Sequence, residues 1–417
     1  MWSRALSPFS RRVFGLLAAG VVGAFIGFGA GLYLAEKRPP RLPKPAAPVV
    51  YIPTSFAALP GWGDDRISEA LPALNASCRV LADKQPTEEI GTGTISRPAS
   101  AWQHACAGLA GASDDADVRR RLEQLFVPYA VVAPGKNGGQ TPDGLFTGYY
   151  EADLTGSLTR QGRFQIPIYG VPRDLVTVDL RQFVPDLPAT APRQLVGHVS
   201  SGPIGNMLVP YFTRKQIDHD HVLDDKADVL LWADDPVAVH ILHIQGSGRV
   251  TLQDGRQIHI GFAGHNGLTF HGIGGILIAA GVLKPGEASM DRVRDWLHAH
   301  PVDAARYMDE NARYIFFRIN PSSGNDNGPP GALGVALSAG RSLAVDPRFV
   351  PLGAPLWLDT ADADGVPIRR LVAAQDMGAA ILGPVRGDLF WGHGEKAFAM
   401  AARMHSTGHY FVLIPIP

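Results

Sequence analysis

A stretch near the C-terminus, residues 371–392, constrains the fold of this chain more than any other part of its sequence. It contains two short apolar runs, 371–374 and 379–382, which are typical of buried β-strands. Burying an ionised carboxylate costs several kcal/mol unless the group is paired or hydrogen-bonded. Although a single aspartate beside a strand is more often a turn residue, three together predict a functional site in a β-structure. The three are Asp346, Asp376 and Asp388.

Helical and strand-like segments alternate along the chain, and their order constrains the domain organisation. Helices are expected over 64–82, 101–110, 113–126, 274–280 and 290–298. Short strands are expected at 175–180, 229–231, 237–244, 249–252, 257–262, 311–319, 333–337, 343–345, 354–358, 371–374 and 410–414. The 47 glycines and 34 prolines favour turn-rich β-structure. A mainly β chain with flanking helices, in which one domain is inserted into another, fits this order better than two tandem domains.

An apolar run without a charged residue occupies residues 13–35 and is long enough to cross the roughly 30 Å hydrocarbon core of a bilayer. It exceeds the apolar core of an ordinary signal peptide, about 7–15 residues. A retained transmembrane anchor is therefore favoured, with a cleaved signal peptide as the alternative. The prolines between 37 and 53 predict an extended spacer behind it. Basic and acidic residues number 38 and 39, and no basic patch predicts a nucleic-acid partner.

The sequence gives no sign of a metal or cofactor site. Two cysteines, Cys78 and Cys106, cannot form a four-ligand zinc site alone. Outside the cytoplasm they could form a disulfide between neighbouring helices, and two buried free thiols are the equal alternative. Histidine-based metal motifs, phosphate-binding loops and dinucleotide fingerprints are absent from the sequence.

The segment Gln-Gly-Ser-Gly at 245–248 invites comparison with a serine nucleophile elbow. It does not match, because a glycine directly precedes Ser247 and no helix is expected after it. A turn that presents the Gln245 amide and the Ser247 hydroxyl to a groove fits the sequence better.

Several sequence blocks together resemble one protein family. They are Asp346-Pro with Pro351-Leu-Gly353, Gln375-Asp376-Met-Gly378-Ala, Gly387-Asp388-Leu-Phe-Trp391-Gly, Phe146-Thr147-Gly-Tyr-Tyr150-Glu151 and Gln245-Gly-Ser247-Gly. Their joint occurrence between residues 145 and 417 is similar to the bacterial membrane-bound lytic transglycosylase A family. The resemblance implies a double-psi β-barrel, an inserted smaller β-domain, and a groove between them for a glycan strand.

The resemblance also implies how the chain is divided and where it works. We expect a cytoplasmic tip and anchor in 1–36, a proline-rich linker in 37–60, and an inserted β-domain in 151–284. The helical part and the catalytic barrel would take 61–150 and 285–417. The body would lie in the periplasm of a bacterial envelope, held to the membrane through its apolar run. Its partners would be peptidoglycan glycan strands and cell-wall synthesis or hydrolysis complexes.

The reaction implied by the resemblance is cleavage of the β-1,4 bond between N-acetylmuramic acid and N-acetylglucosamine in cell-wall turnover. No water takes part, and the product ends in 1,6-anhydromuramic acid. One carboxyl group serves as acid and then as base, and by its place in the motif it is Asp388. An apolar setting and a neighbouring carboxylate would raise its pKa, as an acid catalyst requires. The supporting residues would be Asp376 and Asp346, and the substrate-binding ones Thr147, Tyr150, Gln245, Ser247 and Trp391.

Two other functions remain open from the sequence. An inverting glycosidase would use Asp388 as acid and Asp376 as base, with the carboxyl groups about 6.5–9.5 Å apart. A non-catalytic, anchored peptidoglycan-binding module would need neither. An aspartic-protease dyad is disfavoured, because the block around Asp376 has no second equivalent in the sequence.

Overall fold

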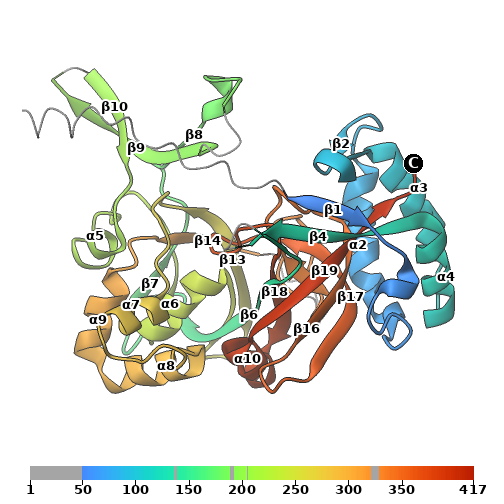
Figure 1. Ribbon diagram of the computed structural model, residues 1–417. Helices are drawn as coiled ribbons and strands as arrows, with labels where there is room; N and C mark the ends of the chain where they lie inside the picture. The colour runs from blue at the N-terminus through green and yellow to red at the C-terminus, as the bar shows by residue number, and fades with distance from the viewer. Residues whose placement is uncertain (1–48, 136–138, 188–191, 204, 321–327) are drawn as a thin grey trace, which may run out of the picture. The chain divides into compact units, whose positions relative to one another are not determined.

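The computed structural model describes residues 49–135, 139–187, 192–203, 205–320 and 328–417 (Figure 1). The predicted anchor at 13–35 and most of the linker lie outside these residues. Within the described ranges, no helix has both the length and the apolar character needed to cross a membrane.

Three α-helices lie in the N-terminal part of the described chain. They are α2 (Leu71–Ala82), α3 (Ala99–Leu109) and α4 (Asp115–Leu125), and a short 3-10 helix, η2 (Ile67–Ala70), leads into α2. The carboxylate of Asp114 caps α4 by accepting a hydrogen bond from the backbone N–H of Asp117, 2.9 Å away. These elements confirm the helices expected there. A disulfide between Cys78 and Cys106 joins α2 to α3.

The long strands belong to one large sheet that contains the C-terminal part of the chain. In order of pairing, its first strands are β1 (Val50–Pro53), β4 (Phe126–Pro134), β19 (His405–Pro415), β16 (Pro355–Ala361), β17 (Pro367–Asp376), β15 (Ser342–Ala344), β18 (Arg386–His393) and β6 (Gly144–Ser157). β19 pairs with β16 and, at its start, also with β6. The short strand β5 (Gln140–Thr141) pairs with β4, and β2 (Glu89–Ile90) pairs with β3 (Arg97–Pro98).

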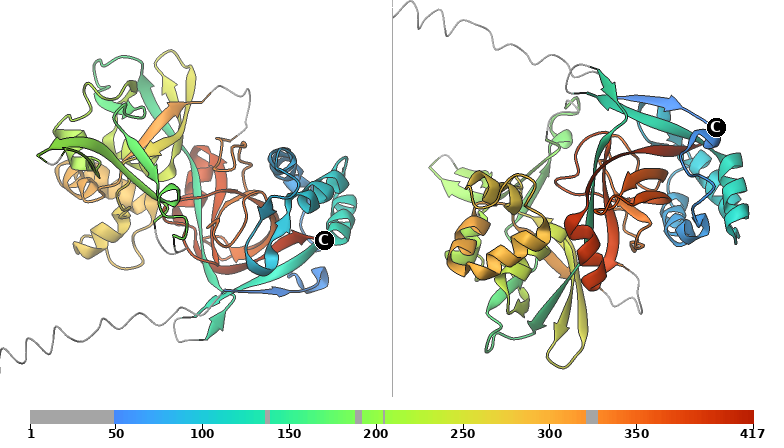
Figure 2. Two further views of the ribbon diagram at one scale, coloured as in Figure 1. Left: turned by 90° about the horizontal axis from the view of Figure 1, so that it is seen from above. Right: turned by 60° about the horizontal axis from the view of Figure 1, so that its bottom comes forward.

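β6 continues past these strands into a second region, where it pairs with β12 (Ser247–Leu252) and with β11 (Val229–Ala233). Beyond β12 the sheet continues with β13 (Gln257–His265) and β14 (Ile315–Ile319), and β11 also pairs with β7 (Ile166–Tyr169). The helices of this region are α5 (Arg214–His219), α6 (Pro236–Gln245), α7 (Ile273–Ala279), α8 (Met290–Ala299) and α9 (Pro301–Asp309). Both views in Figure 2 show α7, α8 and α9 grouped together. A separate sheet contains β8 (Val176–Asp179), β9 (Gln194–Gly202) and β10 (Gly205–Pro210).

Two large hydrophobic clusters correspond to these two regions. The first joins α2, α3 and α4 to the C-terminal strands, and Trp357 and Tyr410 are among its fully buried side chains. The second joins the middle strands to α6, α7, α8 and α9, and it includes residues of α10 (Gly394–Arg403). Trp391 packs against both clusters. The chain is therefore mainly β with some helices, as expected.

Three predicted strands are wrong. Residues 237–244 form α6, because Asp235 caps a helix whose first residue is Pro236, and a short buried apolar run does not distinguish helix from strand. Residues 379–382 form no strand, and Leu382 is 62% exposed. Residues 333–337 form only an isolated bridge at Ala336. Three further helices, α5, α9 and α10, lie where the sequence predicted none.

Candidate active site

Asp388 lies on β18 and is held beside β6. The two strands are parallel neighbours, and Asp388 is paired in register with Thr147. The Thr147 hydroxyl donates a hydrogen bond to Oδ1 of Asp388 over 2.6 Å. The surrounding side chains on β18, Leu389 and Phe390, are buried. The sequence placed Thr147 among the residues that bind sugar, whereas in the structure its hydroxyl contacts Asp388.

Asp376 ends β17 and is held by donors from three directions. The Tyr149 hydroxyl donates to its Oδ2 over 2.8 Å. The backbone N–H groups of Ala332 and Met377 both donate to its Oδ1 over 2.9 Å. Because both carboxylate oxygens already accept hydrogen bonds, the structure holds this carboxylate firmly in place.

The strand register brings Asp376 and Asp388 to the same level of the sheet. β15 lies between β17 and β18, and its residue Ala344 is paired with Asp376 on one side and with Asp388 on the other. Neighbouring strands are about 4.8 Å apart, so two strand spacings separate the two backbones. Two carboxylates at this separation interact electrostatically when little water lies between them.

The two carboxyl groups have raised pKa values. Burial raises the pKa of Asp388 to about 6, while the Thr147 hydrogen bond and the Arg386 charge oppose the shift and the Asp376 charge adds to it. Burial also raises the pKa of Asp376, against the hydrogen bonds that it accepts from Tyr149 and two backbone N–H groups. A carboxyl group with a pKa of about 6 is suited to donate a proton near neutral pH.

Asp346 lies in a different environment. It is 2% exposed, and it accepts hydrogen bonds from the Arg348 guanidinium and from the backbone N–H of Gly383, the latter over 2.8 Å. Burial acts to raise its pKa, but these hydrogen bonds and the Arg348 charge outweigh burial and lower the pKa below its usual value. Asp346 thereby fastens the turn at Gly383, which precedes β18, to the loop after β15.

Three predicted substrate-binding residues lie where β6 meets α6 and β12. The Gln245 side-chain oxygen accepts a hydrogen bond from the backbone N–H of Tyr150 over 3.0 Å. The Tyr150 ring is 7% exposed and packs against Phe398. Ser247, the first residue of β12, is also 7% exposed. The structure brings these residues together around β6, and their contact with sugar stays a prediction.

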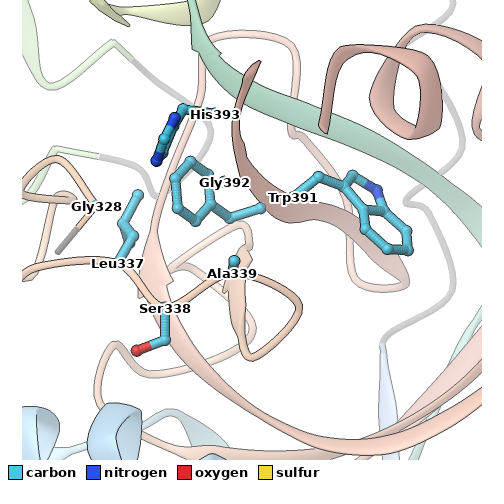
Figure 3. Close-up of a pocket in the computed structure, with 8 residues that line it drawn as sticks. Gly328, Leu337, Ser338, Ala339, Trp391, Gly392 and His393 are labelled. Carbon is cyan, nitrogen blue, oxygen red and sulfur yellow. The ribbon is translucent and has the colours of Figure 1, made fainter. Parts of the chain in front are cut away.

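A pocket of about 360 Å³ opens beside the end of β18. It is lined by Gly328, Leu337, Ser338, Ala339, Phe390, Trp391, Gly392 and His393. Figure 3 shows the Trp391 indole pointing away from Leu337 and Ser338. The indole lies so close to Gly148 that a Cβ atom there would be 2.6 Å from its Nε1. Trp391 therefore contributes to packing between strands, and its role in sugar stacking stays a prediction.

Comparison with known proteins places this geometry in a family. A model of the MltA specific insert domain matches residues 145–318, and a 3D domain model matches residues 341–414. The crystal structure of MltA from Neisseria gonorrhoeae is 32% identical, with a TM-score of 0.70, and the match covers 91% of this chain and 97% of that chain. The chain belongs to the MltA family.

Two further MltA-family relatives agree. The membrane-bound lytic murein transglycosylase from Agrobacterium tumefaciens is 29% identical with a TM-score of 0.73, over 88% of this chain and 97% of that chain. The membrane-bound lytic murein transglycosylase A of Escherichia coli (strain K12) is 27% identical over 280 residues. That match spans 65% of this chain and 66% of the length of the curated relative.

Several polar residues of this MltA-family site were not predicted. Tyr149 and Arg386 contact Asp376 and Thr147 directly. Glu151, which is fully buried, accepts a hydrogen bond from the Arg249 guanidinium over 2.6 Å. Tyr149 and Glu151 stand in the same sequence block as Thr147, which was a usable signal. Arg386 is separated by 239 residues from its partner, and no local pattern marks it.

Metal ligands are not gathered anywhere in the described ranges: no group of three or more His, Cys, Asp or Glu side chains could hold an ion there. The polar groups at the centre of this MltA-family site are the carboxyl groups of Asp376 and Asp388 and the groups that donate hydrogen bonds to them.

Proposed function

We propose that this chain is a lytic murein transglycosylase that cleaves peptidoglycan between N-acetylmuramic acid and N-acetylglucosamine and leaves a 1,6-anhydromuramic end. Family membership supports the reaction class. The observation that carries the assignment to a residue is the environment of Asp388, whose pKa of about 6 suits a carboxyl group that must give up a proton and take one back.

The proposed reaction has two proton transfers and needs one carboxyl group. Asp388 first donates its proton to the glycosidic oxygen, and the bond between that oxygen and C1 of the muramic ring breaks. The muramic C6 hydroxyl oxygen then forms a bond with C1, and its proton passes to the Asp388 carboxylate. The enzyme returns to its starting state, and no water is consumed. Asp376 has the supporting role, because its negative charge favours the protonated form of Asp388.

An inverting glycosidase, in which Asp376 activates water, is less compatible with the hydrogen bonds of Asp376. A general base must accept a proton from water through a free lone pair. Oδ2 of Asp376 accepts from Tyr149, and Oδ1 accepts from two backbone N–H groups. Both lone pairs of Oδ1 are thereby occupied, and only one lone pair of Oδ2 is left for a water molecule. Asp376 is therefore better suited to act on Asp388 through its charge than to exchange protons with substrate.

We also propose a domain arrangement for this function. The pairings of β19 with both β16 and β6 support a double-psi barrel made of β6, β15, β16, β17, β18 and β19. The inserted part would run from within β6 to β14, further than 151–284, because α8, α9 and β14 contribute to the second hydrophobic cluster. Glycan would bind between the two parts, near Asp388, Gln245 and Ser247.

We further propose that the chain works in the periplasmic part of a bacterial envelope, on glycan strands, with residues 13–35 as its membrane anchor. The names of the relatives support membrane association. Other proteins of cell-wall synthesis or hydrolysis remain candidate partners on the strength of the sequence resemblance alone.

Mass spectrometry of fragments released from purified peptidoglycan tests the reaction. The parent chain is expected to release muropeptides that end in 1,6-anhydromuramic acid, each lighter by one water than a hydrolytic product. Asp388→Asn should release them roughly a thousandfold more slowly while still binding glycan. Reducing-end products would show that water attacks and would favour the glycosidase. Binding without fragments in the parent would favour a binding module.

A further inference from the structure

Arg386, two residues before Asp388 on β18, contacts the Thr147 hydroxyl rather than the carboxyl group itself. Its Nη2 donates to Oγ1 of Thr147 over 2.8 Å, and Thr147 in turn donates to Oδ1 of Asp388 over 2.6 Å. The guanidinium is held from the other side, since Nη1 donates to the backbone carbonyls of Leu145 and Gly387. The three side chains form a short chain of hydrogen bonds that ends on the carboxyl group.

The direction of these hydrogen bonds follows from the chemistry of the groups. A threonine hydroxyl has one hydrogen, and it can rotate to point this hydrogen at any acceptor nearby. A guanidinium has only donors. With the Arg386 N–H directed at its oxygen, the hydroxyl must accept on that side, and its own hydrogen is left for Asp388. Arg386 thus removes the freedom that a threonine beside a carboxyl group would otherwise have.

We infer that Arg386 is a positioning residue: it fixes the Thr147 hydroxyl as a permanent donor to Oδ1 of Asp388, so that Oδ2 is the oxygen that gives and takes the catalytic proton. Among the described residues, Thr147 supplies the one hydrogen bond to this carboxyl group, and it goes to Oδ1. This inference rests on the proposed function, and it names the atom at which the proton is held.

An oxygen that already accepts a short hydrogen bond is the poorer site for a proton, because the added proton weakens its capacity to accept. The proton therefore leaves from Oδ2 in the first half of the reaction, and a proton returns to Oδ2 in the second half. Without this arrangement the proton would be shared between the two oxygens, and only the form with the proton facing the glycosidic oxygen would react. We therefore expect this placement of the proton to raise the rate at the optimum pH and to leave the optimum pH itself unchanged.

The positive charge of Arg386 has a second effect that can be separated from the first. Its charge favours the ionised form of Asp388, whereas Asp376 favours the protonated form, and Tyr149 is the other titratable group that faces this pair. Removing the charge shifts the alkaline limb of the pH–rate profile upward whether or not Thr147 is present. The effect of Arg386 on the orientation of the Thr147 hydroxyl can change the rate only in variants that keep this hydroxyl. A double-mutant cycle distinguishes the two effects.

The test compares the full chain with Arg386→Met, Thr147→Val and the double variant, as the initial rate of 1,6-anhydromuropeptide release from below to above pH 6. We expect each single variant to lose roughly tenfold in rate at its own optimum, a typical value for one hydrogen bond to a charged group. The double variant should be no slower than Thr147→Val alone. Thr147→Ser, which keeps the hydroxyl, should restore most of the rate only while Arg386 is present.

The control is Arg306→Met, which removes an exposed arginine on α9 that pairs with Asp303 and should leave the rate unchanged. Arg386→Lys keeps the positive charge but not the two Nη groups that bind Thr147 and the carbonyls of Leu145 and Gly387 together. This variant should therefore lose rate without moving the alkaline limb. It replaces Arg386→Met in the cycle if Arg386→Met does not fold. The inference would be overturned if Arg386→Met slowed the Thr147→Val variant as much as it slows the parent chain. An unchanged rate in Arg386→Met alone would overturn it as well. If the parent itself releases no anhydro products, the proposed function fails instead.

Discussion

Asp346, in the loop after β15, and Asp388, on β18, both lie in the C-terminal part of the chain, yet the structure gives them opposite electrostatic environments. Asp346 is surrounded by donors: an arginine and backbone N–H groups satisfy both oxygens and lower its pKa. Asp388 accepts from one donor among the residues that the structure describes, and burial among apolar neighbours raises its pKa to about 6. The first group therefore stays ionised in the folded protein, and the second can change its protonation state near neutral pH.

The difference shows how one residue type can serve structure in one place and chemistry in another. Burial disfavours the charge in both cases, and the hydrogen bonds and nearby positive charge decide the outcome: those around Asp346 outweigh burial, and those around Asp388 do not. Asp376 is intermediate, because three donors hold it but do not fully offset its burial. Substitution of each aspartate, or of a donor to one of them, tests a separate part of this comparison.

The largest effect is expected from Asp388→Asn. The amide cannot donate a proton and take it back, so the rate of anhydromuropeptide release should fall by roughly a thousandfold, within the range known for general acid–base groups. Stability and glycan binding should be retained, because asparagine can still accept from Thr147. Substantial activity in this variant would show that the proton comes from another group.

Asp346→Asn should act on stability instead. It leaves the Arg348 charge and part of the hydrogen-bonding around Gly383 unsatisfied, and because Arg348 is 46% exposed, we expect a loss of only about 1–2 kcal/mol in the free energy of unfolding. The lowered pKa means that the ionised group stabilises the fold above its usual value of 3.8 and loses this effect as the pH falls through the native pKa. Denaturant unfolding at neutral and at acidic pH measures the loss of stability and its dependence on pH.

The difference in stability between Asp346→Asn and the parent should therefore shrink under acid conditions. Equal stability of the two proteins at neutral pH, together with a large loss of activity, would instead place Asp346 in the catalytic machinery and remove the contrast with Asp388.

Asp376→Asn should shift the alkaline limb of the pH–rate profile to lower pH. Its negative charge raises the pKa of Asp388, so a neutral amide lets that pKa fall and leaves less of the acid form above pH 6. The contribution is smaller than that of burial, and we expect roughly a two- to threefold loss of rate on the alkaline side. A pH–rate profile measures the shift. Complete loss of activity at every pH would support a base role for Asp376.

The smallest effect is expected from Tyr149→Phe. The tyrosine is buried and its ring packs against Phe390, so phenylalanine fits the same space and only the hydrogen bond to Asp376 is lost. The pKa of Asp376 should rise further, so its negative charge should raise the pKa of Asp388 less, and the alkaline limb should shift in the same direction as in Asp376→Asn but less. A shift in the opposite direction would mean that Tyr149 acts on Asp388 itself.

The sequence predicted the elements that carry a strong local pattern. The capped helix after Asp114 and the strand that ends at Asp376 are of this kind, because a cap or an apolar run beside a polar residue determines them locally. Residues 237–244 and 379–382 were assigned wrongly for the same reason, since an apolar run has no periodicity that separates a buried helix, a buried strand and an exposed loop. Asp388 was expected on a loop, whereas it lies on β18.

The partners of the aspartates could not be predicted in the same way. Tyr149 reaches Asp376 across 227 residues of sequence, and Arg386 and Thr147 meet only because β18 and β6 pair in one particular register. A shift of that register by one residue would turn these side chains to the opposite face of the sheet. The motif could therefore single out Asp388 as the candidate catalytic residue, which stays a prediction, but it could not show which residues surround it.

Gln375, the residue before Asp376, joins α2 to the strands of the site. Its fully buried amide donates to the carbonyl of Ala73 and to the Ser77 hydroxyl on α2, and it accepts from Ser342 on β15. Neither matched domain, 145–318 or 341–414, includes α2. A recombinant fragment cut at those boundaries would expose this amide with its donors unpaired, next to Asp376. Expression plasmids and chimaeras of this protein should therefore keep the chain from α2 onward.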